Sequence, residues 1–143
     1  MQNRVTADVR LTDDKVQFTG STRDNPPVVF DYFPPLGDGH GYTGLEGLLL
    51  SLAACSATSV VGLLRQAGKT VSGFEVQAAG VRRTRHPTCF ETISLHFCLT
   101  SSDAGGADMD KAIALSQSTV CPVWAMVRGN VEITTSYEIA KGA

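Results

Sequence analysis

The sequence predicts an α+β domain in which an antiparallel sheet packs on one long, buried central helix. Residues 43–66 are an unbroken run of mostly apolar helix formers without proline, which favours a single helix. Segments on both sides alternate apolar and polar residues with a period of two, as strands do. Because strands, helix, strands and helices follow one another without regular alternation, the pattern is not that of a βαβ fold.

The region before the central helix predicts three short strands. Residues 5–11 and 16–18 carry spaced apolar side chains around a turn at 13–14, which indicates a hairpin. Residues 28–33 are rich in β-branched and aromatic side chains and predict a third strand. The Pro- and Gly-containing segment 34–41 is expected to be the loop that leads into the helix.

The central helix has clear start and stop signals. Thr43 followed by Glu46 is a capping-box pattern, and Gly68 stands just beyond the end. Between these signals no face is clearly polar, so we expect the helix to be buried on most sides. So apolar a helix in a small domain also suggests burial against a second copy, and we expect a homodimer.

The remainder of the chain predicts strands, short helices and a closing strand. Alternation predicts strands over 71–83 and 90–100, joined by a basic hairpin tip. Apolar spacing then predicts a helix over 109–115, and the pair Cys121 and Pro122 predicts the start of another helical segment ending at Gly129. The strand predicted last covers residues 130–139.

Composition limits the functional classes. With 143 residues, of which 43% are hydrophobic, we expect one domain over 1–143. A net charge of -2 gives no basic field for nucleic acid. The first residues do not resemble a secretion leader, and Ser and Thr interrupt the apolar run, so we expect no membrane span. Four cysteines without a C-x-x-C pair then predict reduced thiols in a cytoplasm.

Two of these cysteines differ in what their positions predict. Cys121 precedes Pro122, so it should occupy a helix N-cap, where the helix dipole and free backbone N–H groups favour a thiolate. It is either a reactive cysteine or a buried structural cap. Cys55 lies in mid-helix, where apolar burial raises the pKa of a thiol, so it is either a core residue or needs activation from another segment.

Other arrangements find less support. Glu46 lies nine residues before Cys55, on the opposite helix face, so helix capping is the favoured interpretation of its carboxylate. Cys89 and Cys98 are interpreted as structural, and no serine triad motif is present. A zinc site needs ligand pairs at suitable spacing, which this chain lacks, so we expect no metal and no cofactor. The zinc combination considered was Cys55 and Cys121 with one of His40, His86 or His96.

Four segments of the chain carry a resemblance: the helix LEGLLLSLAACSATSVVGLLRQAGKTV, the segments VRRTRHPTCFETISLHF and ALSQSTVCPVWAM, and the strand VEITTSYEI. Together they resemble the osmotically inducible protein C and organic hydroperoxide resistance (OsmC/Ohr) family. The resemblance runs from about Val28 to Ile139 and is closest to a less characterised subgroup. It implies an intertwined homodimer with active sites at the subunit interface. It further implies an antioxidant, stress-response peroxidase that reduces organic hydroperoxides, with a dithiol such as a dihydrolipoyl group as reductant.

By the resemblance, Cys55 matches the peroxidatic cysteine, Cys121 the resolving cysteine, and Glu46 is the acidic residue nearest to the position of a family glutamate that holds an activating arginine. This chain has Leu45 at the family spacing, and its loop 33–42 offers His40 and no arginine. Arg23, Arg82 and Arg83 are the substitutes. The alternatives are a non-enzymatic dimer that binds a small apolar or electrophilic ligand, and a thiol enzyme with another substrate.

Overall fold

The computed structural model describes residues 3–142, so residues 1, 2 and 143 of the predicted domain 1–143 lie outside the described part. The chain has two compact units, with the boundary between Gly47 and Leu48. The elements are β1 (Asp8–Leu11), β2 (Phe18–Ser21), β3 (Val28–Phe30), α1 (Gly44–Gln66), β4 (Gly73–Arg82), β5 (Phe90–Ser101), α2 (Gly106–Leu115), the π-helix η1 (Ser116–Val120), α3 (Pro122–Val127) and β6 (Glu132–Lys141).

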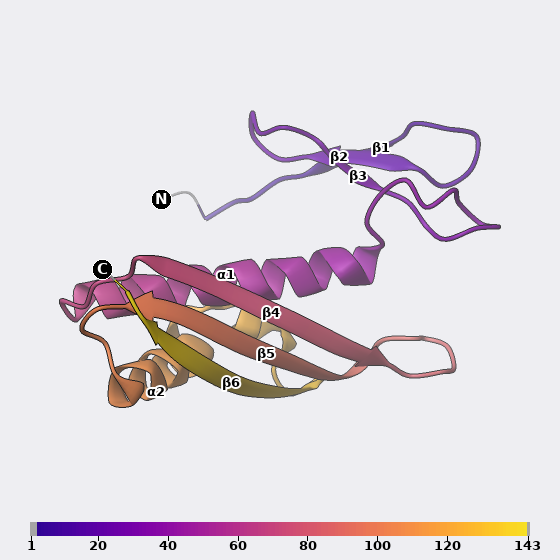
Figure 1. The fold of residues 1–143 in the computed structure, drawn as a ribbon. Coiled ribbons are helices and arrows are strands. Elements are labelled where there is room, and N and C mark those ends of the chain that lie inside the picture. Colours follow the sequence, from indigo (N-terminus) through magenta and orange to yellow (C-terminus); the bar gives the residue numbers. More distant parts are fainter. Residues whose placement is uncertain (1–2, 143) are drawn as a thin grey trace. The chain divides into compact units, whose positions relative to one another are not determined.

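The first unit contains an antiparallel sheet of three short strands in the order β1, β2, β3 (Figure 1). The predicted hairpin and third strand are therefore confirmed. The loop after β3 is held by the carboxylate of Asp31, which is only 4% exposed. It accepts backbone N–H bonds from Tyr32, Asp38 and His40 at 2.8, 3.2 and 3.0 Å. These bonds, with that of His40 the largest contributor, lower the pKa of Asp31.

The predicted start of α1 is confirmed. The backbone N–H of Thr43 donates to Glu46 Oε1 at 2.8 Å, and the backbone N–H of Glu46 donates to Thr43 Oγ1 at 3.2 Å. This reciprocal pair is a capping box, which satisfies N–H groups that a helix start otherwise leaves unpaired. After the helix, Gly68 adopts a φ of 80°, a left-handed conformation that glycine reaches without strain.

The burial of α1 differs from the prediction. Within one chain the helix buries a single stripe of side chains, so the expected burial on most sides is found on one face only. The sheet and the short helices that pack on this stripe leave the other sides of α1 uncovered. By length and composition α1 also qualifies as a membrane-spanning helix, a property that it shares with core helices. The buried residues are Leu52, Ser56, Ser59, Val60 and Leu64.

In the second unit, β4, β5 and β6 lie side by side in that order (Figure 1). The predicted antiparallel pairing holds for β4 with β5, but β5 and β6 are parallel, so the prediction of a wholly antiparallel sheet is wrong. A parallel pair needs a crossover connection, and α2, η1 and α3 supply it between these strands.

One face of this sheet forms the core of the second unit. From Ile93 to Ser101 the side chains of β5 alternate, so every second residue is buried while the intervening ones face outward. Leu95 and Phe97 are 0% and 1% exposed and pack with the buried stripe of α1 and with Met109 of α2. The sheet therefore has an apolar inner face and a polar outer face.

Candidate functional site

The fold brings Cys55 and Cys121 together, although they lie far apart in the sequence. Cys55 is in the middle of α1 and is partly exposed, whereas Cys121 stands before α3 and is 3% exposed. Both thiols are free, and Cys121 lies close enough to Cys55 to shift the pKa of its thiol. Two neighbouring thiols can be oxidised to a disulfide once their sulfurs meet, which is the redox chemistry open to this pair.

Local backbone structure explains the environment of Cys121. It is the N-cap of α3, with extended backbone (φ -76°, ψ 110°) and Pro122 at the first helical position, as predicted. The backbone N–H of Trp124 donates to its sulfur at 3.4 Å, which is the side-chain bond expected of an N-cap. The sulfur therefore occupies the positive end of a helix, where negative charge is favoured.

The surroundings of Cys55 raise the pKa of its thiol, in contrast to the helix start at Cys121, which favours negative charge. Burial raises the pKa of its thiol above the usual value, and the hydrogen bond and negative charge offered by Cys121 raise it further. The nearby backbone N–H of Val123 lowers the pKa of Cys55, but this effect does not outweigh that of burial. A negative charge on Cys121 would thus oppose ionisation of Cys55.

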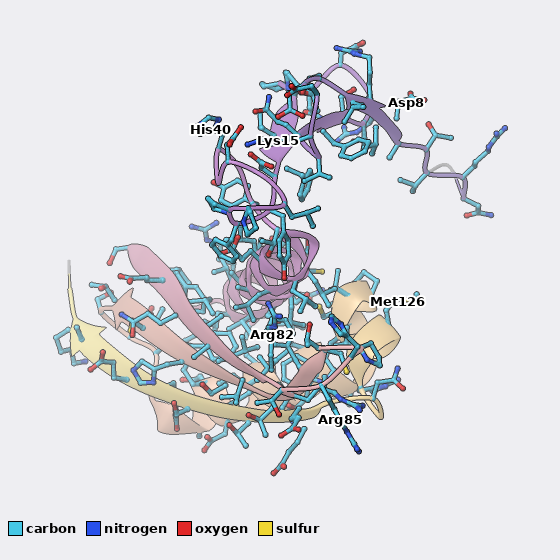
Figure 2. All side chains as sticks on the ribbon, turned by 90° about the vertical axis from the view of Figure 1, so that its right-hand side faces the viewer. Asp8, Lys15, His40, Arg82, Arg85 and Met126 are labelled. Carbon is cyan, nitrogen blue, oxygen red and sulfur yellow. The ribbon has the colours of Figure 1, made fainter. Side chains whose placement is uncertain are left out.

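The basic residues considered from sequence do not act on Cys55 within the second unit. Along the described residues 48–142, no arginine or histidine is among the groups that shift its pKa. Arg82 lies where β4 meets the hairpin tip and donates from Nη2 to Thr88 Oγ1 at 2.8 Å, and Figure 2 shows Arg85 reaching outward from the same hairpin. Arg23 and His40 belong to the first unit, Arg23 in a turn at φ 54°.

Arg128 is a basic residue that the sequence analysis missed. Its Nη1 donates to the backbone carbonyls of Gln117 and Ser118, both at 3.1 Å. These carbonyls belong to η1, which leads directly to Cys121, and the backbone N–H of Cys121 donates to Ser116 O at 2.9 Å. Arg128 therefore holds the segment that presents Cys121. No local pattern signals this role, because a π-helical turn has no recognisable sequence signature.

A second cluster lies on the outer face of the second sheet. The thiol of Cys98 donates to Glu138 Oε1 at 3.2 Å, and His96 Nε2 lies 3.5 Å from the same oxygen. The bond to Glu138 raises the pKa of Cys98, and the bonds from Cys98 and His96 lower the pKa of Glu138. His96 and Cys98 are two residues apart on β5 and so share one strand face, but the sequence analysis did not foresee the carboxylate that joins them.

Comparison with known proteins agrees with this fold. The family model described as "OsmC-like protein" matches residues 37–136. Protein YhfA of Escherichia coli is 36% identical over 95 residues, which are 66% of this chain and 71% of that protein.

Solved structures extend the similarity to the whole fold. The OsmC-like protein of Mycoplasma pneumoniae has a TM-score of 0.79 at 18% identity, covering 100% of both chains. An organic hydroperoxide resistance protein OsmC from Legionella pneumophila has a TM-score of 0.74 at 15% identity, covering 96% of this chain and 98% of that one. With the family model matching more than half of the chain, this protein belongs to the OsmC-like family.

Proposed function

We propose that the protein is a thiol-dependent peroxidase that reduces organic hydroperoxides through Cys55 and Cys121. The observation that carries the proposal is the proximity of two free thiols, one partly exposed and the other at a helix N-cap. The family supports the substrate class, because the related protein of Legionella pneumophila is named for organic hydroperoxide resistance.

Exposure assigns the first step to Cys55. Cys55 is half-buried whereas Cys121 is buried, so we expect a peroxide to meet Cys55 first. The Cys55 thiolate attacks the terminal peroxide oxygen, the O–O bond breaks, and the alkoxide leaves as an alcohol after taking a proton. Cys55 is then a sulfenic acid, and the two electrons have passed to the peroxide.

Cys121 completes the oxidation. Its thiolate attacks the sulfenic sulfur, an S–S bond forms, and the hydroxyl leaves as water after taking a proton. The N-cap position favours this thiolate. A dithiol reductant, for which a dihydrolipoyl group is the proposed class, then reduces the bridge by two thiol exchanges and leaves as its own disulfide.

Activation of Cys55 is the demanding part of this cycle, because its pKa is raised. Loss of the Cys55 proton to solvent produces the nucleophile, and the nearby backbone N–H of Val123 lowers the pKa of Cys55 and so favours this ionisation. In the family resemblance a glutamate-held arginine assists this ionisation. We carry Glu46 as the acidic candidate for that role, with Arg23, Arg82, Arg83 and His40 as the basic candidates.

We further propose a homodimer. Outside its buried stripe, α1 leaves apolar residues uncovered on two parts of its circumference, with Leu48 at 38% and Leu50 at 53% exposure. A second copy related by twofold symmetry would cover this surface and favour the intertwined arrangement expected from the resemblance. The whole chain would then unfold as one domain, and the cytoplasm would keep its thiols reduced. Sedimentation equilibrium tests the dimer, and a single calorimetric transition tests unfolding as one domain.

The test of the activity uses intact-protein and peptide mass spectrometry after addition of cumene hydroperoxide to the reduced protein. We expect a bridge between Cys55 and Cys121, and consumption of peroxide when dihydrolipoamide is supplied. Cys55→Ser should abolish both, whereas Cys89→Ser, which removes an exposed cysteine outside the pair, should change neither. Modification of Cys89 or Cys98 with Cys55 untouched would refute the proposal.

One observation favours a second candidate, a dimer that binds a small apolar ligand and has no peroxidase activity. Burial raises the pKa of Cys55, and along residues 48–142 no cation counters the effect. The first unit also has an apolar hollow of about 330 Å³, lined in part by Val9, Val28 and Phe30. Equal inactivity of wild type and Cys55→Ser with several peroxides would select this candidate.

A further inference from the structure

The outer face of the second sheet gathers three metal-binding side chains. One ligand atom from each of His96, Cys98 and Glu138 lies within 4.8 Å of the other two. This cluster is separate from the cysteine pair, because Cys98 points to the face of β5 opposite the buried core residues. We propose that it binds a zinc ion, with imidazole, thiolate and carboxylate as ligands.

The strand register produces the cluster. β5 is the middle strand, and His96 and Cys98 are two residues apart, so their side chains share one face. On β6, Ser136 lies opposite His96 and Glu138 lies opposite Cys98. On β4, Glu75 lies opposite Cys98 on the other side. The thiol is therefore flanked by a carboxylate on each neighbouring strand, and a cation would meet compensating negative charge.

The distances from Glu138 to the other two ligand atoms suit a tetrahedral metal ion. Zinc bonds of about 2.3 Å to sulfur and about 2.0–2.2 Å to nitrogen or oxygen separate neighbouring ligand atoms by about 3.4–3.7 Å. Glu138 Oε1 lies 3.2 Å from Cys98 Sγ and 3.5 Å from His96 Nε2. The ligand atoms of Cys98 and His96 are at most 4.8 Å apart, so side-chain rotations that move an atom by about 1 Å bring all three around a metal.

A hydrogen bond already orients the His96 ring for metal binding. His96 Nδ1 lies 2.7 Å from Ser136 Oγ. When the proton resides on Nδ1 and is donated to this hydroxyl, Nε2 can give its lone pair to a metal in place of its bond to Glu138. A hydrogen bond on the ring nitrogen that does not bind the metal is the usual support of a metal-binding histidine. Ser136 would fill this role here.

Ligand chemistry selects the metal. Magnesium and calcium prefer sets made only of oxygen atoms, whereas thiolate and imidazole favour zinc and similar ions. On binding, Cys98 releases its proton to solvent and a Zn–S bond replaces the hydrogen bond to Glu138. The fourth position would hold water or the carboxylate of Glu75, whose Oε1 accepts from Gln77 Nε2 at 3.2 Å in the free site.

The experiment uses the reduced, chelator-treated full chain. Equilibrium dialysis measures zinc, and cobalt(II) serves as a spectroscopic probe, because a sulfur-to-cobalt charge-transfer band reports a thiolate ligand. We expect one ion per chain, no binding of magnesium, and loss of the band in Cys98→Ser. His96→Ala and Glu138→Gln should weaken zinc binding by at least about tenfold, the scale on which loss of metal-site contacts acts.

Matched controls separate this site from other thiols. Cys89→Ser and the double variant Cys55→Ser with Cys121→Ser should bind zinc as the wild type does. Circular dichroism and thermal unfolding of each variant without metal establish that it is folded, and Glu138→Gln serves as the conservative variant. Absence of saturable binding, binding that persists in Cys98→Ser, or binding lost in the double variant would overturn the proposal.

Discussion

Replacing Cys121 by serine and by alanine separates its two roles, in redox chemistry and in helix capping. Both variants lose the sulfur, so neither can form the bridge to Cys55. Serine keeps a side-chain acceptor for the backbone N–H of Trp124, which Cys121 now holds at 3.4 Å. Alanine leaves that buried N–H without its partner, so the two variants should differ in stability and agree in redox behaviour.

The structure sets the size of the difference. Loss of an N-cap side chain costs about 0.5–2 kcal/mol, and serine is among the best N-cap residues. The helix that Cys121 caps, α3, has six residues, far fewer than the roughly 12–15 at which an isolated helix becomes even marginally stable. Its start is also buried. We therefore expect Cys121→Ala to be less stable than Cys121→Ser by about 1–2 kcal/mol, in the upper half of the N-cap range.

Urea denaturation at one fixed protein concentration measures this difference, with the m-value expected to stay constant. After peroxide treatment, dimedone labelling and mass spectrometry should find Cys55 as a sulfenic acid in both variants, and no bridge. Equal stability of the two variants would contradict the capping role of residue 121. Formation of a Cys55 bridge to Cys89 or Cys98 in Cys121→Ser would contradict the assignment of the resolving cysteine.

Three further predictions concern the stability of the fold. Glu46→Ala should lower stability by about 0.5–2 kcal/mol because the capping box is lost, whereas Glu46→Gln keeps an acceptor and should cost less, as thermal unfolding can show. Folding lowers the pKa of Asp31, so its ionised carboxylate stabilises the folded state. This stabilisation is complete above the pKa of the unfolded state, near 4, and is lost as the pH falls through the lower pKa of the folded state. Asp31→Asn should therefore flatten the loss of stability on the acid side of a pH series, and an unchanged slope would refute this. Leu95→Ala, at a position 0% exposed, should cost about 2–5 kcal/mol in urea denaturation, compared with a near-neutral Val81→Ala on the exposed end of β4.

Local signals in the sequence were sufficient for most elements. The Thr43 and Glu46 pair predicted the start of α1, and Pro122 predicted the N-cap at Cys121, because capping depends on residues within one helical turn. Alternation located β4, β5 and β6 to within a few residues. These features need no knowledge of the tertiary structure.

Features that depend on long-range pairing were not predicted. Strand direction is decided by the path of the crossover, so the parallel pairing of β6 was missed. The cluster on the outer face requires Glu138 to stand beside Cys98, forty residues earlier, and alternation within a strand does not fix the register between strands. The limited burial of α1 depends on how much surface the rest of the chain can cover.

The central position of β5 restricts insertions and deletions in this protein. Its residues alternate between the core and the outer cluster, so adding or deleting one residue between Ile93 and Leu99 would exchange the two sets. Leucine and phenylalanine would then face water, and histidine and cysteine would enter the hydrocarbon interior. Length variation is therefore expected in the hairpin tip between β4 and β5, while the strand itself keeps a fixed number of residues.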